Sequence, residues 1–100
     1  MEMILTLESR MTARKDLLAT NLSETELVMM NIDEGAYYGL EDVAKVIWDF
    51  LAEPHSVREV CEEVEANFEV DSVTAETDTM GFLQRLLAEG LIELGPSSAV

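Results

Sequence analysis

The chain has 100 residues, the size of one domain with a single modest hydrophobic core. It carries 21 acidic and 6 basic residues, which gives a formal net charge of −15. Nucleic-acid binding depends on Lys and Arg side chains that neutralise phosphates, so this charge argues against DNA or RNA as a partner.

Cys61 is the only cysteine and His55 the only histidine. One cysteine cannot form an intramolecular disulfide, and one Cys with one His cannot build a four-thiolate or two-Cys-two-His zinc site. We therefore expect no cofactor, and the composition is typical of a protein of the reducing cytoplasm.

The N-terminal segment, residues 1–15, contains an apolar patch from Met3 to Leu7 that is too short for a signal peptide or a membrane span. We therefore expect no membrane association. Residues 3–9 are compatible either with an extra strand or with a mobile tail.

Three short apolar segments follow, each bounded by polar residues. They are "LLATNL" (17–22), "LVMMNI" (27–32) and "AYYGL" (36–40), and Gly35 suits a turn with positive φ. This spacing predicts a three-stranded antiparallel meander. Alternation in the third strand places Ala36, Tyr38 and Leu40 on one face and Tyr37 and Gly39 on the other.

After Leu40 the apolar period changes from two to about 3.6 residues, which predicts helices. The first ends before Pro54, because the residue before a proline avoids the α region. Its inward stripe comprises Val43, Ala44, Ile47, Trp48 and Leu51.

The second helix begins at Ser56, and Glu59 lies three residues later, the spacing of a capping box. Its inward face comprises Val57, Val60, Cys61, Val64 and Phe68.

The third helix begins near Asp71 or Ser72 and ends at Gly90, a residue suited to a left-handed C′ position. Its main stripe comprises Met80, Leu83, Leu86 and Leu87, with Phe82 on a flank. Leu91 and Ile92 are expected to return to the core, and residues 95–100 to form a frayed end.

Three strands followed by three helices predict an α+β fold that is winged helix-turn-helix-like. The domain is expected to span residues 16–94. No motif places a Ser, Cys or His for catalysis: His55 follows a proline between helices, and Cys61 lies on a buried helix face. We therefore expect a protein that is not an enzyme.

The ordered features of residues 16–92 resemble the PqqD family, whose small domains bind leader peptides of ribosomally synthesised, post-translationally modified peptides. They are the turn and strand "DEGAYYGL", the Ile47-Trp48 and Leu51 helix, the Ser56-Val57-x-Glu59 helix start, the Phe68-x-Val70-Asp71 link, and then Asp78, Phe82-Leu83, Leu86 and Gly90-Leu91-Ile92.

This resemblance implies that a leader peptide adds as an antiparallel strand to the free edge of the third strand, in the cleft beside the third helix. The residues expected to bind it are Ala36, Tyr37, Tyr38, Gly39, Asp78, Phe82 and Arg85. Arg85 would meet an acidic leader residue, and Asp78 would accept a hydrogen bond. The expected partners are the precursor's leader peptide and a modifying enzyme supplied in trans, either a leader peptidase or a radical SAM enzyme.

Two residues depart from the family pattern. Glu41-Asp42 follow Leu40 where many relatives carry Asn, so Asp42 is expected to cap the first helix. Thr79 stands where an apolar residue is usual.

Other interpretations stay open at this point. The two tyrosines also suit a purely structural strand, and Asp78 and Arg85 also suit a solvated helix face. A winged-helix transcription-associated or protein-interaction module is the alternative function, with a small metal- or redox-linked domain behind it. A homodimer formed edge to edge is also compatible with the sequence.

Overall fold

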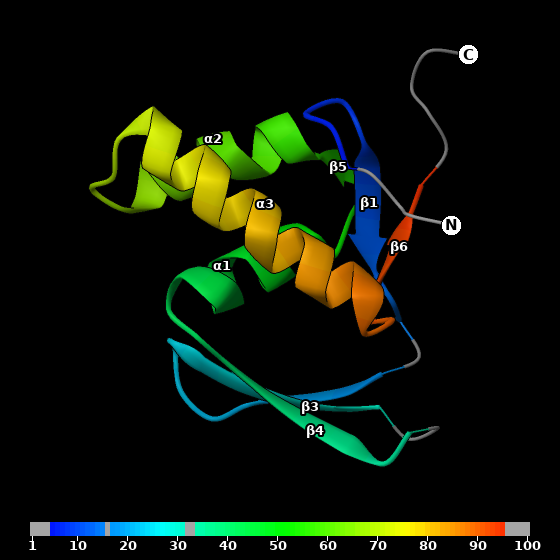
Figure 1. Cartoon of the computed structure of the whole chain (residues 1–100). Coiled ribbons are helices and arrows are strands. Elements are labelled where there is room, and N and C mark those ends of the chain that lie inside the picture. Colours follow the sequence, from blue (N-terminus) through cyan, green and yellow to red (C-terminus); the bar gives the residue numbers. More distant parts are fainter. Residues whose placement is uncertain (1–4, 16, 32–33, 96–100) are drawn as a thin grey trace.

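The computed structural model describes residues 5–15, 17–31 and 34–95. Within these ranges, β2 (Leu18–Asn21), β3 (Glu26–Asn31) and β4 (Ala36–Glu41) form an antiparallel sheet in the order β2-β3-β4. The helices α1 (Val43–Phe50), α2 (Val57–Asn67) and α3 (Ser72–Ala88) lie on one side of this sheet (Figure 1). The predicted α+β fold, a three-stranded antiparallel sheet followed by three helices, is confirmed.

The meander has the register that side-chain alternation predicts. Met29 of β3 lies opposite Tyr38, and Leu27 lies opposite Leu40. Met29, Leu27 and Leu40 are buried, so these pairs form the face of the sheet that packs against the helices. Gly35, just before β4, has the expected positive φ of 65°. The last residue of the strand predicted at 27–32 lies outside the described residues.

The junction between β4 and α1 differs from the expectation for Asp42. Asp42 occupies the N-cap position, and its carbonyl accepts a hydrogen bond from the Val46 N–H at 3.0 Å, but its side chain makes no capping bond. The backbone is at φ 50° and ψ −113°, far from the extended conformation that directs an N-cap side chain at the first free N–H groups. The prediction that Asp42 caps α1 through its side chain is therefore wrong.

The starts of the other two helices agree with their sequence signals. In α2 the Glu59 N–H donates to Ser56 Oγ at 3.1 Å, and the Ser56 N–H donates to Glu59 Oε1 at 2.9 Å, which completes the capping box. In α3 the Thr74 N–H donates to Asp71 Oδ1 at 2.8 Å. Gly90, with φ 74°, follows the C-terminal end of α3.

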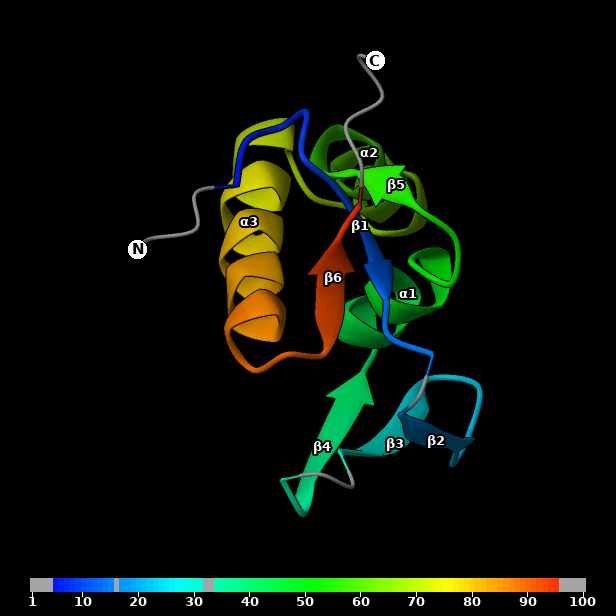
Figure 2. The ribbon, with the colours of Figure 1, turned by 90° about the vertical axis from the view of Figure 1, so that its right-hand side faces the viewer.

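A second small sheet joins distant parts of the chain. β1 (Arg10–Ala13) pairs antiparallel with β5 (His55–Ser56) on one side and with β6 (Ile92–Leu94) on the other (Figure 2). The extra strand lies at residues 10–13, after the segment 3–9 that was considered for it. Of that segment, residues 5–9 are not in a strand, with Leu5 buried in the core, and residues 3–4 lie outside the described residues. Gly95 donates its N–H to the Arg10 carbonyl at 2.8 Å. The rest of the predicted frayed end, 96–100, lies outside the described residues.

The core lies between the helices and both sheets. Trp48, Cys61, Leu91 and Ile92 are buried as predicted. On α3 the buried residues are Ala75, Thr79, Leu83 and Leu86, whereas Met80, assigned to the main stripe, is only half-buried. Thr79 is 2% exposed, and its side chain hydrogen-bonds the Cys61 thiol of α2. This hydrogen bond lets a polar side chain occupy a core position.

Candidate functional site

A groove runs between β4 and the C-terminal half of α3, with a volume of about 310 Å³. β4 contributes Tyr37, Tyr38, Gly39 and Leu40 to its lining, and α3 contributes Phe82, Arg85 and Leu86. The groove is completed by Ala44, Glu89 and Leu91.

A second cavity of about 280 Å³ lies between α1, α2 and the N-terminal half of α3. It is lined mainly by apolar side chains, and Ala44 and Phe82 belong to its wall as well as to the groove. Phe82 therefore stands where the two hollows adjoin. Together they form a depression that follows α3 for somewhat more than three turns, from Thr74 to Leu86.

The structure brings most of the sequence-predicted residues to this depression. Tyr37, Tyr38, Gly39, Phe82 and Arg85 line the groove, and Asp78 lines the adjoining cavity. Ala36, at the start of β4, lines neither of these two hollows. The i, i+4, i+7 spacing on α3 does place its three residues on one face.

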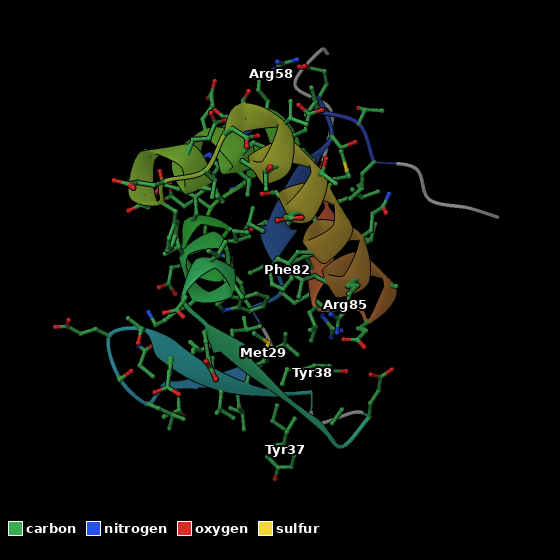
Figure 3. All side chains as sticks on the ribbon, turned by 60° about the vertical axis from the view of Figure 1, so that its left-hand side comes forward. Met29, Tyr37, Tyr38, Arg58, Phe82 and Arg85 are labelled. Carbon is green, nitrogen blue, oxygen red and sulfur yellow. The ribbon has the colours of Figure 1, made fainter. Side chains whose placement is uncertain are left out.

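Tyr38 and Tyr37 point to opposite sides of the sheet. Figure 3 shows Tyr38 between β4 and α3, on the same side as Phe82 and Arg85, and Tyr37 directed away from the helices. Tyr38 is half-buried, whereas Tyr37 is 71% exposed. Partial burial, followed by the negative charges of Glu89 and Glu34, raises the pKa of the Tyr38 phenol above its usual value. Its hydroxyl is therefore neutral at physiological pH and is able to donate a hydrogen bond.

Arg85 differs from the other basic residues in its surroundings. Arg10, Arg14, Lys15, Lys45 and Arg58 each contact a carboxylate or a backbone carbonyl. Within the described part of the chain, the exposed Arg85 side chain has neither an ion pair nor a hydrogen bond. A guanidinium group without a partner at the edge of an apolar groove is suited to bind a carboxylate.

Five residues that line the groove were not among those expected to bind the peptide: Leu40, Ala44, Leu86, Glu89 and Leu91. Leu40, Leu86 and Leu91 were expected only as core residues. Ala44 was assigned only to the core stripe of α1, yet it lines both hollows. Glu89 follows Arg85 by four residues, so extending the Asp78, Phe82, Arg85 series by one turn would have identified it. The groove lining therefore carries a negative charge at Glu89 as well as the positive charge of Arg85.

The edge of β4 that faces the groove is open. β4 pairs only with β3 among the described strands, so one row of its backbone N–H and C=O groups has no strand partner. Such an edge accepts an added strand.

His55 and Cys61, the residues considered for catalysis, are held in packing and hydrogen-bond contacts of the fold. The His55 ring stacks on Phe50, with centroids 3.8 Å apart, and its Nδ1 lies 3.3 Å from Glu59 Oε1. Burial raises the pKa of the Cys61 thiol, which keeps it protonated and unreactive. The described residues contain no group of three or more side chains able to hold a metal ion, and no described helix is long and apolar enough to cross a bilayer.

Fold and groove together define a small winged-helix-like α+β domain with an open strand edge beside a helix. The family profile described as "Coenzyme PQQ synthesis protein D (PqqD)" matches residues 26–92, and the chain belongs to this family. Among solved structures, the chain is similar to "TbiB1 in Complex with the TbiA(beta) Leader Peptide". The two share 28% sequence identity with a TM-score of 0.73, and the match covers 82% of this chain and 94% of that one. None of the curated proteins matches the chain.

Proposed function

We propose that this protein binds the leader peptide of a ribosomally synthesised, post-translationally modified peptide precursor, and that it acts without catalysis of its own. The observation that carries the proposal is the groove between the open edge of β4 and α3. Membership of the PqqD family and similarity to TbiB1, solved with a leader peptide, support it.

In the proposed complex the leader lies extended along β4 as an added antiparallel strand. Backbone hydrogen bonds to the free edge of β4 then supply affinity without regard to sequence, and the side-chain hollows supply selectivity. Alternate leader side chains would point toward α3, because successive residues of a strand face opposite sides.

The lining of the two hollows defines what these inward side chains would be. Phe82 and the half-buried Tyr38 ring favour apolar leader residues. Arg85 favours an acidic residue, and the exposed carboxylate of Asp78 is available to accept a hydrogen bond. An extended peptide antiparallel to β4 reaches the apolar cavity at the C-terminal end of β4 first and Arg85 later. The acidic residue is therefore expected C-terminal to the apolar one.

Binding of the leader would present the rest of the precursor to a modifying enzyme, either a leader peptidase or a radical SAM enzyme. The domain would raise the effective concentration of the precursor at that enzyme instead of lowering a chemical barrier. Micromolar or tighter affinity is expected for such a role, which corresponds to about 8 kcal/mol of binding free energy or more.

Replacing Phe82 tests the proposal. Phe82→Ala removes the ring at which the groove and the cavity adjoin, so we expect leader affinity to fall by about tenfold or more, as for a central interface residue. The leader is that of a precursor peptide to be sought as a short open reading frame near the gene of this chain, and affinity is measured by fluorescence anisotropy with the labelled leader.

Phe50→Ala is the matched control, because Phe50 is also half-buried but stacks on His55 and lines neither hollow. Both variants are expected to lose similar stability in urea unfolding, and only Phe82→Ala to lose affinity. Equal affinity of the two variants for the leader would refute the groove as the binding site.

A further inference from the structure

The face of the β2–β3–β4 sheet opposite the helices carries an apolar row. Leu18, Met30 and Tyr37 are directly opposite one another across the three strands. Residues opposite in register share a face, so these three side chains form one continuous stripe across the sheet. We call this surface the outer face; it comprises Leu18, Thr20, Val28, Met30, Tyr37 and Gly39.

The exposure of this row is unusual for an open sheet. Leu18 is 56% exposed and Tyr37 71%, and Leu22, just beyond β2, is 63% exposed. Antiparallel sheets that are packed on one side usually place polar residues on the solvent side. Met30, between Leu18 and Tyr37 in the row, is half-buried, so the exposed apolar surface lies at the two ends of the row, on β2 and β4. Exposed apolar surface of this kind marks an interaction site.

Gly39 leaves a recess in this face. It lies opposite Val28 in the register, and a Cβ atom built on Gly39 would meet no atom within 4 Å. Gly39 is not at positive φ, so the backbone does not require glycine here. The missing side chain lets a partner approach the backbone beside the apolar row.

A pair of like charges borders the same face. Glu26 of β3 and Glu41 of β4 are directly opposite in register, and both are exposed. Neither carboxylate has an ion pair among the described residues. Like charges directly opposite in a sheet are destabilising, and a cation placed between them reverses the effect.

We propose that the outer face docks the modifying enzyme, through an enzyme surface with an apolar centre and Lys or Arg residues at its edge. This rests on the proposed leader-binding function. Charge decides between an enzyme and a second copy of this chain, because a second copy would bring its own Glu26 and Glu41 and another −15 of net charge to the interface.

The geometry allows the enzyme and the leader to bind together. Tyr37 and the outer face lie on one side of the sheet, and Tyr38, Phe82 and Arg85 on the other (Figure 3). β4 carries both surfaces, so an enzyme on the outer face would lie one strand away from the bound leader. Tyr37 and Gly39 belong to both surfaces, whereas the outer-face residues of β2 and β3 lie outside the groove. An enzyme held mainly by β2 and β3 would therefore lie beside the precursor and leave the side of β4 that faces α3 open.

Leu18→Glu tests this assignment, because Leu18 is on β2, two strands from the groove, and its exposure predicts little loss of stability. The probes are the labelled leader and the purified leader peptidase or radical SAM enzyme that modifies the same precursor. We expect enzyme affinity, measured by biolayer interferometry, to fall by about tenfold or more. Leader affinity, measured by anisotropy, should stay within about twofold, since additivity holds for separate sites. Thr20→Glu, on the same face, should lower the affinity for the enzyme by a similar factor.

Val73→Glu is the matched control, because Val73 is 74% exposed on α3 and lies outside both hollows. It should leave enzyme affinity unchanged. Unchanged enzyme affinity in both outer-face variants, an equal loss in Val73→Glu, or a dimer of the native chain that Leu18→Glu dissociates would each overturn the docking proposal. Absence of leader binding by the native chain would instead refute the proposed function, so the two failures are distinguishable.

Discussion

Asp42 connects β4 to α1 with a backbone conformation that side chains rarely adopt. Its φ of 50° with ψ of −113° lies in a region that favours glycine, and its side chain makes no capping bond in return. The Asp42 N–H is held by the Thr25 carbonyl at 2.9 Å, so the hairpin fixes this conformation. Strain at this residue is the cost of turning the chain directly from the edge strand into the helix.

Glycine at position 42 should relieve this strain. We expect Asp42→Gly to raise the free energy of unfolding by about 1 kcal/mol, since an unfavourable φ costs roughly 1–3 kcal/mol and glycine loses part of that gain to the entropy of the unfolded chain. Asp42→Ala keeps the strain and should bring no gain. Urea unfolding of both variants measures the difference, and equal stabilities would contradict the strain.

The protonation of Glu59 is linked to the stability of the fold. The hydrogen bond from the Ser56 N–H, followed by the contacts with His55 and Arg10, lowers the pKa of Glu59 below its usual 4.5. A lowered pKa in the folded state stabilises the fold above the unfolded value, and this contribution is lost as the pH falls through the folded value.

Glu59→Gln keeps an acceptor for the Ser56 N–H but removes the charge. We expect the stability difference between the native chain and Glu59→Gln to be largest at neutral pH and to shrink below pH 4.5, where Glu59 becomes protonated. Urea unfolding over this pH range measures it. A stability difference between the native chain and Glu59→Gln that does not change with pH would contradict this linkage.

At the scale of elements, the meander and the helices were predictable because their signals are local. Alternation in "AYYGL" fixed which tyrosine faces α3, and the Ser56-Glu59 spacing fixed the start of α2. β1, β5 and β6 were not predicted, because β5 has only two residues and β1 pairs with segments far away in the sequence. A two-residue strand has no periodicity to detect.

The buried face of α3 also could not be predicted in full from local sequence signals. The sequence favoured Met80, the larger apolar residue, over Thr79. The structure buries Thr79 beside the Cys61 thiol of α2, which shares a side-chain hydrogen bond with it. Only the position of α2 reveals this partner. The spacing of Ala75, Thr79 and Leu83 was a signal for close helix packing that hydropathy alone did not indicate.

At the scale of the whole molecule, the acidic surface and the distribution of its few cations support selective binding. Five of the six basic side chains are held by contacts within the chain, and Arg85 remains available at the groove. Long-range repulsion by the net charge disfavours acidic peptides in general, while in the proposed complex Arg85 would accept one leader carboxylate at a defined position. The position of the groove relative to β4 and α3 could be expected from the family resemblance, but Ala44 and Glu89 required the structure.

The most direct test of the account is an amide-shift titration of the isotope-labelled protein with the leader peptide. We predict the largest perturbations along β4, from Ala36 to Leu40, and on α3, from Asp78 to Arg85, with little change in β1, β5 and β6. Tight binding with perturbations confined to other surfaces, or no perturbation at all, would contradict leader recognition at the β4–α3 groove.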